Sequence, residues 1–229
     1  MEKDAAGTER ERVKAARGAG GAGDKKVRGS MLRSYTPADL LTLANASCGT
    51  LSIFACLSYI EGDRSRQIWA AFVLPIFALV LDAADGYVAR LDVRRQSRLG
   101  ADLDSLADIV SFGVAPAVLG YTLGLRGLWD VVFLTYFVCC GISRLARFNV
   151  TAAAMTDADT GKVSYFEGTP IPTSILLVML MAAMFHFGLT GPGFWGGHHE
   201  ILGKGFHPFS LLFFASGSLM ISTIKVPKP

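Results

Sequence analysis

Six apolar stretches recur along the chain, each close to the length needed to cross a lipid bilayer. They lie near residues 37–60, 67–90, 104–125, 128–148, 169–190 and 206–224. A membrane-spanning helix needs about 20 mostly apolar residues. Of the 229 residues, 51% are hydrophobic and only 18% are charged, which is low for a soluble domain. The sequence therefore predicts an all-α integral membrane protein with six transmembrane helices.

The first 34 residues have a different composition from the rest of the chain. They hold nine Lys or Arg and five Asp or Glu, include a stretch rich in Gly and Ala, and contain no apolar run. We expect residues 1–34 to form a polar, disordered arm and residues 35–229 to form one membrane domain. Because the remainder is close to neutral, the charge pattern gives no support for nucleic-acid binding.

Loop charges indicate the orientation. With six spans and the arm on the inner side, the same side collects the cationic loop residues Arg94, Arg95, Arg98, Lys162, Lys225 and Lys228. Cytoplasmic loops of membrane proteins carry an excess of Lys and Arg. Both termini are therefore predicted to be cytoplasmic.

Several charges must lie at membrane depth. The run from Ile68 to Leu81 holds only 14 uncharged residues before Asp82. An ionisable group inside the bilayer is costly and usually faces a protein cavity with a function. The charges in the second, third and fourth stretches thus predict one internal polar site, on the cytoplasmic side.

Four aspartates are spaced so that they can meet in that site. Asp82 and Asp85 are three residues apart, and Asp104 and Asp108 are four apart, so each pair shares one face of a helix. Two facing helices bring the four carboxylates together, where they need cations to stay ionised. Hard oxygen ligands of this kind suit Mg²⁺ or Mn²⁺. The alternative is a set of helix caps and surface charges that happen to be periodic.

The same residues belong to a longer pattern, D-x2-D-G-x2-A-R followed by G-x3-D-x3-D. The matching positions are Asp82, Asp85, Gly86, Ala89, Arg90, Gly100, Asp104 and Asp108. In this pattern the chain closely resembles the CDP-alcohol phosphotransferase family, with nine residues rather than the common eight between Arg90 and Gly100. The resemblance implies a six-helix membrane core, a homodimer, and transfer of a phosphatidyl or similar group from a CDP-linked donor to an alcohol, with release of CMP.

The resemblance also implies roles for these residues. Two divalent ions, bound by the four aspartates, grip the diphosphate of the donor, and Asp108 acts as the base that takes the proton of the acceptor hydroxyl. Arg90 lies near the cytidyl or phosphate end of the donor, and Gly86, with Ala89 and Gly100 of the motif, leaves room for it.

Two polar residues in the first stretch are further candidates. Thr42 and Asn45 lie one turn apart and are candidates for donor binding. Their alternative role is hydrogen bonding between helices.

Other segments resemble the phosphatidylserine synthase branch of the family. They are residues 104–117, residues 144–149 and residues 168–172. Serine carries a carboxylate, so Arg144 and Arg147, three residues apart, are predicted to bind serine or the donor phosphates, with Asn149 in support. The alternative is that these arginines only set the topology.

The predicted reaction is therefore transfer of the phosphatidyl group from CDP-diacylglycerol to L-serine. One alternative is the same chemistry with another acceptor, such as inositol phosphate or glycerol phosphate, or with an ether-lipid donor. From other classes, a divalent-cation transporter also needs intramembrane carboxylates, and a scaffold without activity is a further alternative.

Overall fold

The computed structural model describes residues 37–62, 65–91, 98–156, 165–194, 196–201, 203–222 and 225–227. Only the backbone is described for residues 89–91, 98–99, 151–156, 165–167, 192, 201 and 225–227. The chain divides into two units, Met1–Tyr35 and Thr36–Pro229, and every described residue belongs to the second. The predicted arm of residues 1–34 therefore lies outside the described residues.

Within the described residues, four helical stretches are long and apolar enough to cross a membrane. They lie in α2 (Pro37–Gly62), in α3 (Ser65–Leu91), in the run from α4 (Arg98–Asp108) to α5 (Ala115–Leu123), and in α6 (Leu128–Thr156). The prediction of a mostly helical membrane protein is confirmed. The third helix begins six residues earlier than position 104, and the fourth ends well beyond position 148, because hydropathy marks only the apolar part of a helix.

The last two predicted stretches form shorter helices. The fifth is a 3₁₀ turn, η4 (Ile171–Ser174), continued by α7 (Ile175–His186), and the sixth is α8 (Ser210–Ile221). Gly188, with a φ of 71°, lies two residues after the end of α7. Both helices are apolar but shorter than the first four, so the count of six spans stays a prediction.

The third span is not a regular α-helix. A π-helical segment, η3 (Ile109–Val114), separates α4 from α5, and the Ala115 N–H donates to the Val110 carbonyl. The next residue, Pro116, has no backbone N–H and so cannot donate a helical hydrogen bond. Apolar periodicity predicted one uninterrupted helix here, because a single widened turn leaves no mark in hydropathy. Such π segments often occur at functional sites.

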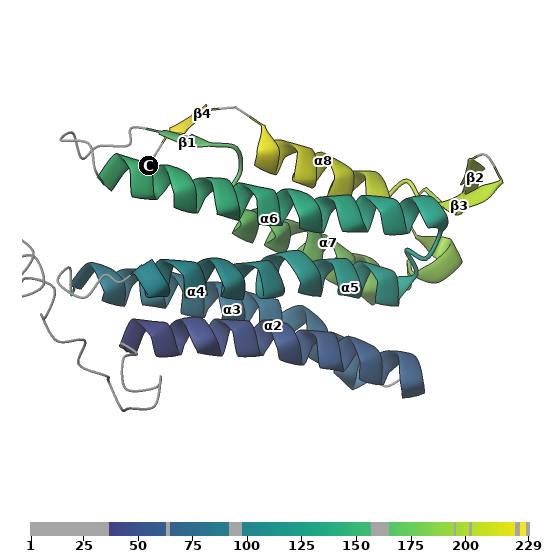
Figure 1. Cartoon of the computed structure of the whole chain (residues 1–229). Helices are drawn as coiled ribbons and strands as arrows, with labels where there is room; N and C mark the ends of the chain where they lie inside the picture. Colours follow the sequence, from purple (N-terminus) through teal and green to yellow (C-terminus); the bar gives the residue numbers. More distant parts are fainter. Residues whose placement is uncertain are drawn as a thin grey trace, which may run out of the picture. The chain divides into compact units, whose positions relative to one another are not determined.

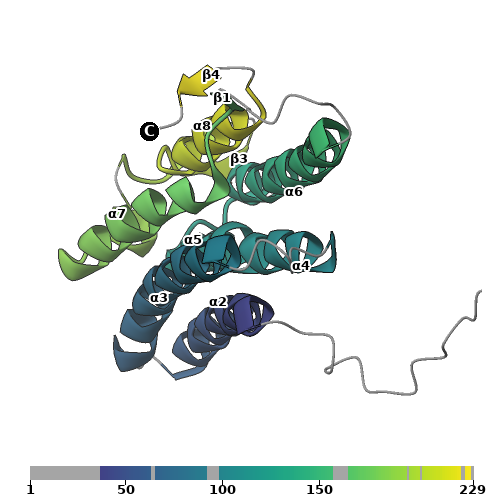
Figure 2. The ribbon, with the colours of Figure 1, turned by 90° about the vertical axis from the view of Figure 1, so that its left-hand side faces the viewer.

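The helices pack around the third span. Figure 2 shows the α4–α5 run between α2 on one side and α6 on the other, with α3 beside α2 and α8 beside α6. In Figure 1 the start of α2, the start of α4 and the end of α6 all lie at the left-hand end of the helices. Residues far apart in the sequence are thus gathered at one end.

In the described chain, two pairs of short antiparallel strands lie at opposite ends of the helices. Strand β1 (Tyr165–Glu167) pairs antiparallel with β4 (Lys225–Pro227), so that Tyr165 faces Pro227. At the other end, after the turn η5 (Gly191–Gly193), β2 (His199–Ile201) pairs antiparallel with β3 (Lys204–Phe206). Three-residue strands carry too little alternation to be predicted from sequence.

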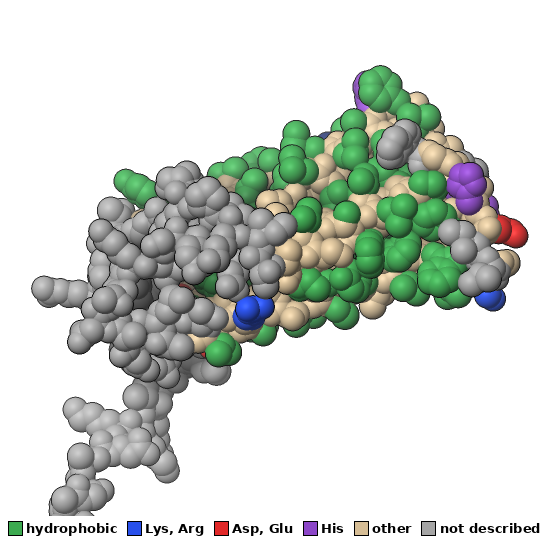
Figure 3. Space-filling view, turned by 90° about the horizontal axis from the view of Figure 1, so that it is seen from above, with side chains coloured by type: hydrophobic (Ala, Val, Ile, Leu, Met, Phe, Trp, Pro, Cys, Tyr) green, Lys and Arg blue, Asp and Glu red, His purple; other side chains and the backbone are tan. Residues whose placement is uncertain are grey.

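Small residues allow close contact between helices, as expected where lipid removes the hydrophobic drive for association. A Cβ atom added to Gly49 would lie 2.5 Å from the Ser111 hydroxyl, and one added to Gly217 would lie 3.1 Å from the Phe137 Cα. Large apolar side chains instead point outward from most helices, among them Leu51, Phe77, Val150 and Leu176. Figure 3 shows hydrophobic side chains spread along the flank, with His, acidic and basic side chains at the right-hand end and a basic side chain also visible beside the grey residues on the left.

Candidate active site

Acidic side chains from α3 and α4 meet beside the first turns of α2. One carboxylate oxygen from each of Asp82, Asp104 and Asp108 lies within 4.8 Å of the other two. Asp108 is buried, and Asp82 and Asp104 are partly buried. The structure thus brings together three of the four aspartates that the helical spacing placed in one site.

The fourth aspartate, Asp85, lies next to this group and is held by α2. The Thr42 hydroxyl donates a hydrogen bond of 2.8 Å to Asp85 Oδ2. The Asp85 carboxylate is buried and close enough to Asp82 and Asp104 to interact with them electrostatically. Thr42, predicted as a donor-binding candidate, therefore contacts the acidic cluster directly.

Asn45 makes the equivalent contact with Asp108. Its Nδ2 donates a bond of 3.3 Å to Asp108 Oδ1, and Asn45 has no exposed surface. The Asn45 carbonyl accepts a bond of 2.9 Å from the Ser111 hydroxyl in the π segment. One residue of α2, Asn45, therefore contacts both Asp108 and the π segment that follows it.

Three buried polar atoms around the cluster have no hydrogen-bond partner within the described part of the chain. They are Asn45 Oδ1, Asp104 Oδ1 and Arg144 Nε. Burying such atoms without partners costs free energy, so unpaired atoms beside the acidic cluster favour a bound ligand. Two of the three are oxygen acceptors, suited to a cation or a donor group, and one is an N–H donor.

The first glycine of the motif, Gly86, occupies an open position. A Cβ atom added to Gly86 would meet no atom within 4 Å, so no protein group requires a glycine there. Gly100 is half-buried on α4. Ala89 and Arg90 lie on α3, but their side chains are outside the described residues, so their predicted roles stay predictions.

The candidates for acceptor binding lie near the end of α6. Arg144 is half-buried and interacts electrostatically with Asp108, whereas Arg147 is exposed. Asn149 Nδ2 donates a bond of 3.4 Å to Asp102, and Asn149 Oδ1 accepts one of 3.1 Å from Ser105. Arg144 therefore faces the acidic cluster, while Asn149 links α6 to α4.

Sequence patterns missed two residues that position the site. Ser111 fastens the π segment to α2, and Ser105 contacts Asn149 across the α4–α6 interface. A single serine within an apolar helix is a weak signal, because its hydroxyl commonly bonds its own helix.

Residues 35–215 match the model of a protein family described as CDP-alcohol phosphatidyltransferase. The chain belongs to the CDP-alcohol phosphatidyltransferase family. The resemblance seen in the aspartate motif is thus confirmed.

Individual relatives extend this family assignment. The chain is 43% identical over 203 residues to a CDP-diacylglycerol–serine O-phosphatidyltransferase of Saccharomyces cerevisiae, covering 87% of this chain and 73% of the relative. It is 35% identical over 192 residues to an archaetidylserine synthase of Methanothermobacter thermautotrophicus, covering 83% and 69%. It is also 35% identical over 201 residues to a CDP-diacylglycerol–serine O-phosphatidyltransferase of Helicobacter pylori, covering 84% and 72%. Like its family, this phosphatidyltransferase is an integral membrane protein.

Proposed function

We propose that this phosphatidyltransferase moves the phosphatidyl group of CDP-diacylglycerol to the hydroxyl of L-serine and releases CMP. The observation that carries the proposal is the cluster of Asp82, Asp104 and Asp108 at one end of the spans. The names of the relatives from yeast and Helicobacter pylori, which specify this donor and acceptor, support the choice of substrates.

The donor set of the cluster fits a divalent cation. Carboxylates this close together repel one another unless a cation neutralises them, and Asp104 Oδ1 is buried without a hydrogen-bond partner in the described chain. Asp82, Asp85, Asp104 and Asp108 are the residues that would hold two such ions, Mg²⁺ or Mn²⁺. When bound, they would supply positive charge to the diphosphate oxygens and to the departing CMP.

Asp108 is proposed to take the proton of serine. As the serine hydroxyl oxygen bonds to the phosphorus of the phosphatidyl group, its proton passes to the Asp108 carboxylate, and the bond from that phosphorus to the CMP oxygen breaks. The Asn45 amide, bonded to Asp108 Oδ1, leaves Oδ2 as the oxygen without this bond. Asn45 therefore acts as a positioning residue for Asp108.

The substrates are proposed to bind on either side of this carboxylate. Gly86 leaves open space on α3 for the donor nucleotide, with Ala89, Arg90 and Gly100 of the motif around it. Arg144 offers an unpaired N–H to the serine carboxylate or the donor phosphates, with Arg147 and Asn149 in support.

For the whole chain we propose six spans, both termini and the active site on the cytoplasmic side, and a homodimer, with residues 1–34 as a separate arm. Support for the orientation comes from the cationic loop residues, which the six-span prediction assigns to the same side as the aspartates.

The test is serine-dependent release of CMP from CDP-diacylglycerol by the purified full-length protein, with Mg²⁺ or Mn²⁺. We expect Asp108→Asn to abolish turnover and Asp102→Asn, which changes an exposed carboxylate two turns away, to retain it. Turnover with another alcohol but not with serine would overturn the acceptor assignment. Absence of turnover with every alcohol, combined with metal uptake into vesicles, would favour a transporter.

A further inference from the structure

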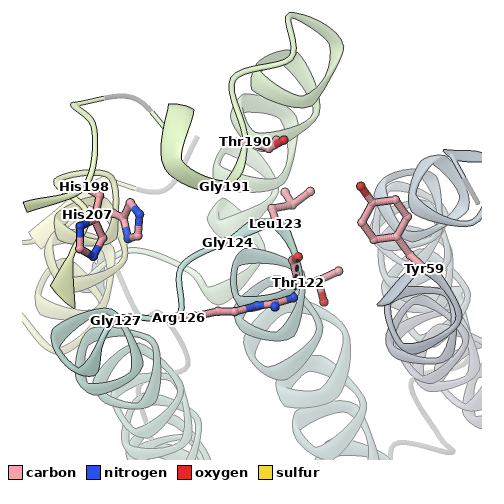
Figure 4. A pocket seen from close by; sticks show the side chains of 10 residues that line it. All are labelled: Tyr59, Thr122, Leu123, Gly124, Arg126, Gly127, Thr190, Gly191, His198 and His207. Carbon is pink, nitrogen blue, oxygen red and sulfur yellow. Dashed lines mark hydrogen bonds between the residues drawn. The ribbon is translucent and has the colours of Figure 1, made fainter. Parts of the chain in front are cut away.

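A cavity lies at the opposite end of the helices from the aspartates. Its volume is about 590 Å³, within the range of small-ligand sites. Figure 4 shows polar side chains around it from several elements, including Tyr59 from the end of α2, Thr122 and Arg126 from the end of α5 and the loop after it, and Thr190, His198 and His207 from the segments between α7 and α8.

Helix geometry separates this cavity from the proposed active site. Tyr59 follows Asn45 on α2, and Thr122 follows Asp108 on the third span, in each case by roughly 14 residues, or about 20 Å of helical rise. The hydrocarbon core of a bilayer is about 30 Å thick. The cavity therefore lies toward the membrane surface opposite the aspartates.

Arg126 gives the cavity a positive charge. Its Nε donates to the Tyr121 carbonyl at 3.2 Å and its Nη2 to the Thr122 carbonyl at 3.4 Å, and the guanidinium lies 5.5 Å from the centre of the Tyr121 ring. A guanidinium has about five N–H donors, so donors remain. Among the described residues, none that lines the cavity is acidic and none forms an ion pair with Arg126.

Asp130 is a carboxylate beside the cavity that is already hydrogen-bonded within the protein. Asp130 is fully buried and accepts bonds from the Gly127 N–H at 2.9 Å, the His207 N–H at 2.8 Å and His207 Nδ1 at 2.7 Å. Because Nδ1 donates to Asp130, Nε2 of a neutral His207 ring is an acceptor. Asp130 thus holds two cavity-lining residues, Gly127 and His207, in place from separate segments.

His198 and several exposed apolar side chains lie near the mouth of the cavity. The His198 ring lies 5.1 Å from the His207 ring, so two imidazoles stand side by side at one wall. Large apolar side chains on the neighbouring elements are exposed, namely Tyr121, Leu128, Phe187 and Leu189. A ligand with an anionic head and apolar tails matches this combination better than a small anion does.

We propose that this cavity binds the phosphate headgroup of an anionic phospholipid from the leaflet opposite the active site. The phosphate oxygens accept hydrogen bonds from the Arg126 guanidinium and from a ring N–H of His198, and the acyl chains lie against the exposed apolar side chains. The inference does not depend on the reaction proposed for the aspartates.

The test measures lipid binding to the full-length protein in nanodiscs of phosphatidylcholine, titrated with spin-labelled phosphatidylglycerol, a lipid that is neither proposed substrate nor product. We expect a saturable site that Arg126→Gln weakens roughly tenfold, the effect of losing one charge-assisted hydrogen bond. Arg126→Lys keeps the charge and should retain more of the affinity. The matched control is Arg66→Gln, which removes an exposed arginine at the same end of the helices.

The outcomes separate the alternatives. Equal lipid affinity in wild type and Arg126→Gln would overturn the proposal. A loss of affinity in Arg66→Gln as large as that in Arg126→Gln would also overturn it, because lipid binding would then reflect only surface charge. Competition by millimolar inorganic phosphate as effective as that by lipid would show a free-anion site and overturn the lipid assignment. If Arg126→Gln lowers the thermal stability, His198→Gln with intact stability decides the result, and unchanged lipid binding in that variant would refute the site.

Discussion

Asn45 illustrates how an uncharged residue can control a charged site. It is fully buried, bonds Asp108 with its amide and Ser111 with its carbonyl, and keeps one further oxygen without a partner in the described chain. Its effect on the reaction passes through the orientation of the Asp108 carboxylate.

We expect Asn45→Ala to lower kcat by about tenfold or more, because a hydrogen bond to a charged group is lost. The KM for serine should change less than kcat does. Initial rates of CMP release measure both constants. Thr50→Ala, which removes an exposed hydroxyl bonded within α2, is the control, and an equal loss in both variants would show a general effect on the helix.

The acidic cluster leads to a metal prediction that does not depend on activity. We expect Asp104→Asn to lose most of its Mn²⁺ binding, measured by electron paramagnetic resonance of the free ion, because it removes a charge from the ligand set. Asp102→Asn, two residues away and exposed, should bind like the wild type. Retention of full affinity in Asp104→Asn would remove this residue from the proposed ligands.

At the scale of elements, the contact between α2 and the π segment decides where the aspartates lie. Gly49 is the small residue that permits it, since an added Cβ would lie 2.7 Å from the Ser111 Cα, a backbone atom. Gly86 on α3 has open space instead, although both are helical glycines.

We therefore expect Gly49→Ala to lower the free energy of unfolding by about 2 kcal/mol, the usual cost of overpacking. Gly86→Ala should leave stability nearly unchanged but raise the KM for CDP-diacylglycerol, because the methyl group enters the proposed donor site. Denaturant unfolding in detergent and initial-rate kinetics measure the two effects. Reversal of the two stability results would contradict the packing shown here.

The contact between Asp130 and His207 joins the start of α6 to the segment before α8. We expect Asp130→Ala to lower the free energy of unfolding by about 3 kcal/mol, because three N–H groups lose their buried acceptor. Asp102→Ala removes an exposed carboxylate and should cost no more than about 0.5 kcal/mol. Similar unfolding midpoints for the two variants would argue against a structural role for the buried pair.

At the scale of the whole molecule, the proposed six spans have a direct test in cysteine labelling. After Cys48, Cys56, Cys139 and Cys140 are replaced by Ala, we expect Asp102→Cys to react with an impermeant reagent from the cytoplasmic side. Arg66→Cys and Thr190→Cys should react from the other side, because an odd number of spans separates each of them from Asp102. If Thr190→Cys instead reacts from the cytoplasmic side, α7 does not cross the membrane.

The sequence by itself determined the membrane class, the positions of four long helices and the motif that assigns the family. These properties follow from local composition and from spacing within one helix, which repeat every few residues. It also placed the aspartates on shared helical faces, since two residues three or four apart must lie on one side of a helix.

Only the tertiary structure decided which residues complete the site. Thr42 meets Asp85, Asn45 meets Asp108 and Asp130 meets His207 across 43, 63 and 77 positions of sequence. The π segment and the cavity around Arg126 likewise depend on how separate helices pack. Local periodicity carries no information about such contacts, because they are set by the close approach of helices at small residues and by the pairing of buried polar groups that lipid cannot solvate.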